Sequence, residues 1–163
     1  MKNKRAFLLA EETVKIIIAL VCISFLVYFL SSLYFSNKHN GDLNLAKASL
    51  EHLISEINSK SENVDIYNPS SSKYFPGGWI VISFPLGSEK PSSCSKQGWN
   101  DCLCICGEST TTLTDSGLAQ DCDSSGTCIE SDFKIVGKKI RIENPPITLQ
   151  INYDSKVISE NGA

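Results

Sequence analysis

The chain has 163 residues, a formal net charge of -3 and seven cysteines. A chain of this length forms one domain, or one small domain beside an anchor, which excludes a large multidomain assembly. The excess of acidic residues disfavours a nucleic-acid partner, because the field of the whole protein repels phosphate. Six of the seven cysteines lie between Cys94 and Cys128, a density that indicates an oxidising compartment.

The first patterned segment is residues 16–35, a run of twenty residues without a charged side chain. A helix of that length spans about 30 Å, the thickness of a bilayer core, so we expect one transmembrane helix with the lipid bilayer as its partner. The basic residues Lys2, Lys4 and Arg5 precede it. The positive-inside rule therefore places residues 1–15 in the cytoplasm and the chain after Ser36 outside. A cleaved secretory signal is disfavoured, because no small residue stands at position 34, three residues before Asn37.

The first eleven residues combine a short basic leader ending in Arg5 with Ala6, Phe7 and, at the fifth position counted from Phe7, Glu11. This pattern resembles the class III signal of type IV prepilins, over residues 4 to about 35. The resemblance implies cleavage between Ala6 and Phe7 and pairing of Glu11 with the freed amine of a neighbouring subunit. It also implies a long N-terminal helix followed by a small disulfide-containing antiparallel sheet, and other pilin-like subunits as partners. A plain anchor with a charged cytoplasmic first turn remains the alternative.

Residues 36–60 are predicted to form a linker and a short amphipathic helix. The polar stretch 36–41 ends in Gly41, which can end one helix, and Asp42 is suited to cap the next. Apolar residues then follow at helical spacing: Leu43, Ala46, Leu50, Leu53 and Ile57. Two heptads are too few for a coiled coil, so we expect this helix to pack within its own subunit.

Residues 61–163 predict a small extracytoplasmic β domain, so the fold class is α+β. Short β-rich runs separated by Gly, Pro, Ser and Asp occupy residues 64–67, 79–84, 102–106, 127–130, 133–136, 139–143 and 147–153. They indicate one antiparallel sheet. Residues 70–78 and 107–117 are loops by composition.

Cys102, Cys104 and Cys106 alternate in the run CLCIC. In a strand their side chains point to one face, while Leu103 and Ile105 point to the other. Cysteines two apart in a strand have Cβ atoms about 6–7 Å apart, beyond the ~4 Å that a disulfide needs. Each of the three is therefore expected to pair with one of the remaining three, Cys94, Cys122 and Cys128. Six pairings satisfy this rule, and Cys22 stays free in the apolar helix.

Two metal sites are possible alternatives, one for zinc at the cysteines and one for calcium, and neither is favoured. The cysteines lack the Cys-x-x-Cys spacing of zinc sites, and both histidines lie far upstream. Asp121, Asp123 and Ser125 reproduce the opening of a calcium loop, but an ordinary hairpin turn is the preferred interpretation of that segment. We therefore expect no metal and no cofactor.

The chain shows no arrangement that predicts catalysis. It has no histidine near a candidate triad, no phosphate-binding glycine loop and no redox Cys-x-x-Cys, so it is not expected to be an enzyme. The predicted function is that of a single-pass, cell-surface structural or adhesive protein, in its sharper form a type IV pilin-like subunit. The alternative is a surface module that never assembles and that binds through exposed loops around Trp79 and Trp99.

Overall fold

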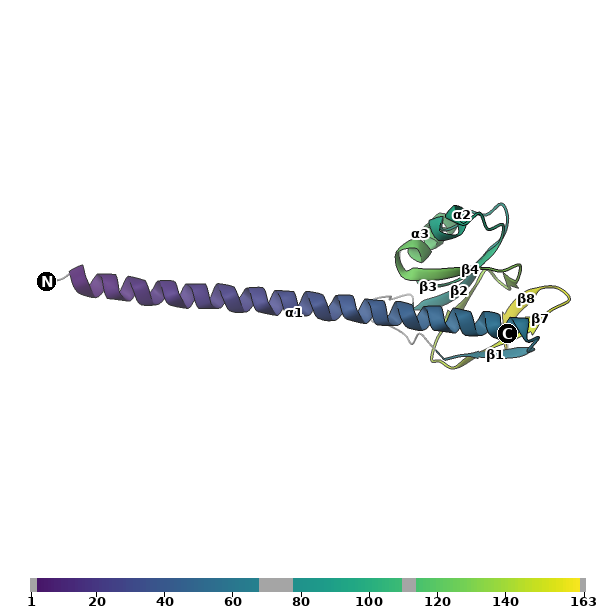
Figure 1. Cartoon of the computed structure of the whole chain (residues 1–163), viewed down its shortest axis with the longest axis horizontal. Helices are drawn as coiled ribbons and strands as arrows, with labels where there is room; N and C mark the ends of the chain where they lie inside the picture. Colours follow the sequence, from purple (N-terminus) through teal and green to yellow (C-terminus); the bar gives the residue numbers. More distant parts are fainter. Residues whose placement is uncertain (1–2, 68–77, 110–113, 162–163) are drawn as a thin grey trace. The chain divides into compact units, whose positions relative to one another are not determined.

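The computed structural model describes the backbone of residues 3–67, 78–109 and 114–161, and the side chains of these residues except 3–11, 39 and 115. The chain forms two compact units, Met1–Asn40 and Gly41–Ala163. In chain order (Figure 1) the elements are α1 (Asn3–Asn58), β1 (Asn63–Ile66), β2 (Trp79–Phe84), α2 (Ser92–Lys96), β3 (Cys102–Gly107), α3 (Asp115–Ser125), β4 (Gly126–Glu130), β5 (Lys134–Ile135), β6 (Lys139–Ile142), β7 (Ile147–Asn152) and β8 (Val157–Glu160). The α+β class is as expected.

The helix α1 is continuous over its 56 residues, so the predicted break at 36–41 is wrong. A glycine inside a helix costs only about 1 kcal/mol relative to alanine. Continuing a helix that is already formed on both sides is easier than ending it and nucleating a second one. Gly41 and Asp42 are therefore interior positions of α1 rather than a stop and a cap.

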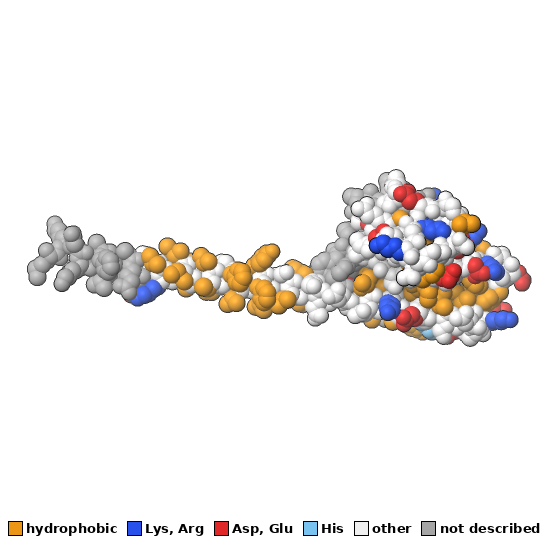
Figure 2. Space-filling view, turned by 45° about the horizontal axis from the view of Figure 1, so that its top comes forward, with side chains coloured by type: hydrophobic (Ala, Val, Ile, Leu, Met, Phe, Trp, Pro, Cys, Tyr) orange, Lys and Arg blue, Asp and Glu red, His pale blue; other side chains and the backbone are white. Residues whose placement is uncertain are grey.

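In the first unit, every described side chain from residue 12 to residue 38 is exposed. Apolar side chains occupy all sides of the helix; Figure 2 shows them in orange along the visible face. The polar Ser24 returns its hydroxyl to the carbonyl of Leu20, one turn earlier, at 2.9 Å. This helix is long and apolar enough to cross a membrane, with a mean hydropathy of 2.7 in its most apolar window.

The second unit holds two four-stranded sheets rather than the single sheet predicted. Their strand orders are β1-β7-β8-β5 and β4-β3-β2-β6. All neighbouring strands are antiparallel except β5 and β8, which run parallel. The strand β8 was not predicted, because its four residues Val157–Glu160 carry too little pattern to be distinguished from a turn.

The main core of this unit lies between the sheets and the last turns of α1. The predicted helical stripe is buried here through Ala46, Leu50, Leu53 and Ile57, which confirms packing within the subunit. The strands β2 and β3 contribute Trp79, Val81, Leu103 and Ile105, all fully buried. This aliphatic face of the β2–β3 pair, defined by those four residues, is one of its two buried surfaces.

The opposite face of the same strands carries a second core with α2 and α3 above it (Figure 1). We call it the disulfide face; its strand residues are Ile80, Ile82, Phe84, Cys102, Cys104 and Cys106. The helix α3 lies in segments predicted as loop and hairpin turn, and α2 lies between the predicted runs 79–84 and 102–106, where no element was predicted. The helix α3 begins after Thr114, whose side chain accepts from the Gly117 N–H at 3.3 Å. The predicted loop 70–78 lies outside the described residues except for Gly78.

Candidate functional site

The six clustered cysteines form three disulfides on the disulfide face. The bridges are Cys94–Cys102, Cys104–Cys128 and Cys106–Cys122, with sequence separations of 8, 24 and 16 residues. Each strand cysteine thus pairs with one of the other three and with no strand neighbour, as expected from the alternation in CLCIC. Cys22 carries no disulfide and is exposed on α1.

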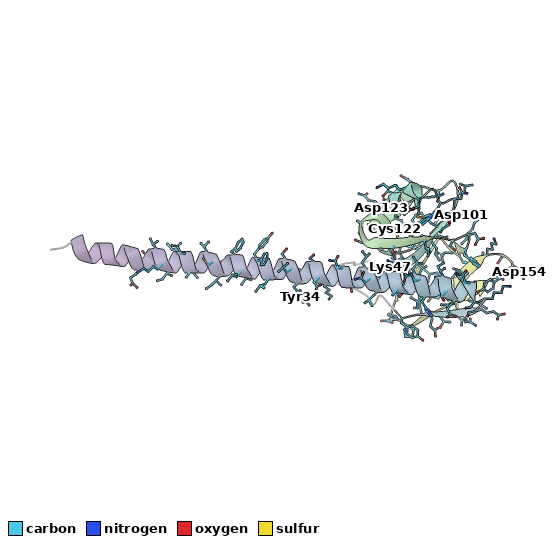
Figure 3. All side chains as sticks on the ribbon, in the orientation of Figure 1. Tyr34, Lys47, Asp101, Cys122, Asp123 and Asp154 are labelled. Atoms are coloured by element: carbon cyan, nitrogen blue, oxygen red, sulfur yellow. A yellow bond between two sulfur atoms is a disulfide. The ribbon has the colours of Figure 1, made fainter. Side chains whose placement is uncertain are left out.

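Each bridge joins β3 to a different element. Cys94 comes from α2, Cys122 from α3 and Cys128 from β4, where it lies directly opposite Cys104 in the antiparallel register. Figure 3 labels Cys122 on α3, next to Asp123. The helices α2 and α3 that lie over the disulfide face are therefore each covalently attached to β3.

Gly126, at the junction of α3 and β4, shows how closely the chain approaches one bridge. A Cβ at this position would lie 2.7 Å from the Cys122 carbonyl oxygen and 2.8 Å from Cys106 Sγ. No real side chain makes such contacts without a shift of the backbone. Glycine is thus required here by the Cys106–Cys122 bridge.

Glu108 is a buried carboxylate that the sequence analysis missed. It follows Cys106 by two residues, the same spacing that separates the cysteines of β3, and is only 3% exposed. Its carboxylate pairs with the Lys139 ammonium, and Arg141 Nη2 lies 3.1 Å from Oε2 without the angle of a hydrogen bond. Lys139 and Arg141 lie opposite Ile82 and Ile80 in the register of β6 with β2, so all these groups share the disulfide face.

The signal for Glu108 was present in the sequence. A two-residue period that starts at Cys102 places Glu108 on the buried face, and the same period on β6 aligns Lys139 with Arg141. A buried carboxylate needs such partners, because an unpaired charge in a core is strongly unfavourable.

The segment considered for calcium is the end of α3, not a hairpin turn, so the preferred interpretation of that segment is wrong. The Asp123 carboxylate accepts the Ser92 N–H and hydroxyl at 2.9 Å each and the Ser93 N–H at 3.2 Å. Asp121 Oδ2 accepts the Ser109 N–H at 3.0 Å, and Ser125 is the last residue of the helix. Both carboxylates thus accept hydrogen bonds from backbone N–H groups of other segments.

Asp123 serves as the cap of α2 from outside that helix. The residue that precedes α2 is Pro91, which has no side chain able to cap it. Burial raises the pKa of the Asp123 carboxyl, but hydrogen bonds from Ser92 and Ser93 and the charge of Lys96 outweigh it, so the pKa lies below the ordinary value of 3.8. The charged form is therefore stabilised in the folded protein.

The two tryptophans do not form an exposed binding surface. Trp79 is fully buried in the main core, and Trp99 is half-buried against the second core. Trp79 lies at the start of β2 opposite Gly107 and is itself covered, while the loop residues 70–77 before it lie outside the described part of the structure.

One apolar cavity of about 230 Å³ lies between β2, β5 and α3. It is lined by Ile82, Phe84, Leu118 and Ile135, together with charged side chains that include Lys134 and Lys138. Ligand pockets typically measure about 300–1,000 Å³, so this hollow is small for a cofactor or drug-sized molecule. No sequence pattern marked it.

The residues that carry the prepilin resemblance lie within α1. Ala6, Phe7 and Glu11 have helical backbone, and their side chains are outside the described part of the structure. Comparison with family models, curated proteins and solved structures yields no match for this chain.

Proposed function

We propose that this protein is a single-pass membrane protein with an extracytoplasmic disulfide-bonded domain, and that it serves as a pilin-like structural or adhesive subunit. The observation that carries the proposal is the apolar surface of α1 from residue 16 to residue 35. Its window of mean hydropathy 2.7 has none of its residues buried within the chain. An apolar helix surface of this size must be covered by lipid or by other apolar helices.

The disulfides support the predicted side of the membrane. Three bridges within residues 94–128 are stable in an oxidising compartment and are not maintained in a reducing cytoplasm. The basic residues before the apolar run favour a cytoplasmic N-terminus. Both observations point to a domain outside the cell, reached by one crossing.

The order of elements supports the pilin-like form of the proposal. A long helix comes first, its last turns pack into the core of a small β domain, and the disulfides lie in the second half of the chain. This is the order that the N-terminal resemblance implies. The glutamate that would pair with a neighbouring subunit's amine is Glu11, and the cleaved bond would precede Phe7.

The experiment that tests assembly uses two adjacent carboxylates. Glu11→Ala and Glu12→Ala each remove one negative charge from the same turn of α1. We expect Glu11→Ala to abolish recovery in sheared filaments while membrane insertion persists, and Glu12→Ala to behave like wild type. The mature wild-type protein should begin at Phe7 by N-terminal sequencing. A mature protein that begins at Met1, with both variants remaining membrane-bound monomers, would establish a plain anchor.

Orientation is tested separately. Protease added to spheroplasts should digest the chain after residue 40 and leave a membrane fragment that contains the apolar run. A protected β domain would reverse the topology.

A further inference from the structure

The Cys104–Cys128 bridge lies beside each of the other two bridges. Cys94 Sγ lies 3.9 Å from Cys104 Sγ, although the two atoms belong to different bridges. The sulfurs of Cys94, Cys104 and Cys128 lie within 4.8 Å of one another, as do those of Cys104, Cys106 and Cys122. Cys104 is thus the sulfur common to both groups. The disulfide face therefore presents one connected row of sulfur atoms.

The bridges differ in their access to solvent. Cys94, Cys102, Cys104, Cys106 and Cys122 are at most 2% exposed. Cys128 is half-buried and lies on β4, an edge strand of its sheet. A thiol in solution exchanges only with a disulfide sulfur that it can reach, so Cys128 is the accessible entry to the row.

We propose that Cys128 is a site of modification by low-molecular-weight thiols, and that Cys104 relays the exchange to the Cys94–Cys102 bridge. In the first step an external thiolate attacks Cys128 Sγ, a mixed disulfide forms there, and the Cys104–Cys128 bond breaks. The electron pair leaves on Cys104 as a thiolate. The released Cys104 thiolate then lies beside Cys94 Sγ, since the two sulfurs are 3.9 Å apart.

In the second step the Cys104 thiolate attacks Cys94 Sγ. The Cys94–Cys104 bond forms, the Cys94–Cys102 bond breaks, and Cys102 leaves as a thiolate that takes a proton from water. One external thiol is consumed and one protein thiol appears, so the number of disulfides is unchanged. The attachment of α2 moves from the first to the third residue of β3, and β4 loses its link to that strand.

A disulfide between Cys104 and Cys102 is excluded by geometry. Cys102 and Cys104 are two residues apart in β3, and their Cβ atoms are about 6–7 Å apart, too far for a bridge. The thiol that the relay produces at Cys102 therefore cannot bond to Cys104; it can only reverse the second step by attacking Cys94, so Cys94 exchanges between Cys102 and Cys104. This gives the relay a chemical signature that can be mapped.

The test uses full-length protein in detergent micelles with Cys22→Ala, so that the free thiol of α1 does not interfere. In this background Cys128→Ala leaves Cys104 without its partner. After acid quenching, alkylation and non-reducing peptide mapping, we expect a Cys94–Cys104 bridge and label on Cys102. The matched control is Cys94→Ala/Cys128→Ala, which removes the attacked sulfur and should place label on both Cys102 and Cys104. Label confined to Cys104 in the single variant would overturn the proposal.

A second measurement does not depend on how the variants fold. The Cys22→Ala protein is exposed briefly to reduced glutathione, quenched and mapped. We expect glutathione on Cys128 and alkylation of Cys102 in the same molecules. Glutathione on another cysteine first, or a free thiol that stays at Cys104, would contradict the entry point or the relay, respectively.

Discussion

The two faces of the β2–β3 pair are both buried, and they are stabilised in different ways. The aliphatic face meets the last turns of α1 and the second sheet, and large side chains such as Trp79 and Leu103 fill the space. In the described part of the chain, the disulfide face meets Trp99, the five-residue helix α2 and α3, whose buried contacts come mainly from Leu118 and Ala119. Where the covering elements are small and polar, covalent bridges supply the stability that apolar area supplies on the other side.

The largest effect is expected on the aliphatic face. Leu103 is fully buried, and Leu103→Ala leaves a cavity in the main core, which should lower the free energy of unfolding by about 3–4 kcal/mol. Denaturant unfolding under non-reducing conditions measures it. Leu86→Ala is the control, because Leu86 is 71% exposed and should change stability by less than about 0.5 kcal/mol. Similar losses for both would mean that Leu103 does not pack as described.

On the disulfide face, the cost of removing a bridge should follow loop length. The chain-entropy relation gives about 3.4 kcal/mol for the 24-residue separation of Cys104–Cys128 and about 2.5 kcal/mol for the 8-residue separation of Cys94–Cys102. Replacing both cysteines of one bridge by alanine leaves no thiol to exchange. Unfolding of the two double variants should therefore differ by about 1 kcal/mol. A reversed order would show that native packing around the bridge, rather than the unfolded chain, sets its contribution.

The ion pairs at the end of the disulfide face come next. Glu108→Gln keeps the shape but removes the charge that Lys139 and Arg141 share. We expect a loss of about 2 kcal/mol, within the range for hydrogen bonds to charged groups and reduced because the Arg141 side chain is 49% exposed. Glu143→Gln, on a residue 71% exposed, is the control and should be nearly neutral. Raising the salt concentration should weaken the Glu108 effect only slightly, since a buried pair is little screened.

The smallest effect concerns the cap that α3 provides to α2. Asp123→Ala should cost about 1 kcal/mol at neutral pH, the usual value of a lost helix cap. Because the folded pKa is lowered, this contribution is complete above the ordinary pKa of 3.8 and disappears as the pH falls through the lower folded value. The difference between wild type and Asp123→Ala should thus shrink in acid. Asp123→Asn keeps a hydrogen-bond acceptor, so its loss in the free energy of unfolding should be smaller and independent of pH. A difference between wild type and Asp123→Ala that stays constant with pH would contradict the charged cap.

Much of the β domain could be predicted because its strands carry a period of two. The run 79–84 matches β2, and the alternation in CLCIC predicted both the two faces of β3 and the rule for its bridges. The choice among the six allowed pairings could not be predicted. It depends on where α2 and α3 place Cys94 and Cys122, and neither helix was recognised.

The two helices were missed because their sequences favour turns. The helix α3 reads DSGLAQDCDSS, in which Asp, Ser and Gly are poor helix formers. Tertiary contacts override that preference: the Cys122 bridge and the burial of Leu118 fix the helix on the sheet. In α1 a helix end was predicted where none exists. Gly41 and Asp42 suggested a break, but the helical segments on both sides continue through them.

The middle of α1 has a consequence for how the protein is turned over. Residues 36–41 include Ser36, Asn37, Asn40 and Gly41, all poor helix formers and all exposed, so these residues bury little surface. Such turns open locally without unfolding the sheets, and their amides should exchange with deuterium faster than those of the flanking turns. An endoprotease, which requires an extended substrate, should cut here first. The disulfide-linked remainder would then be shed from the apolar helix as a single water-soluble fragment.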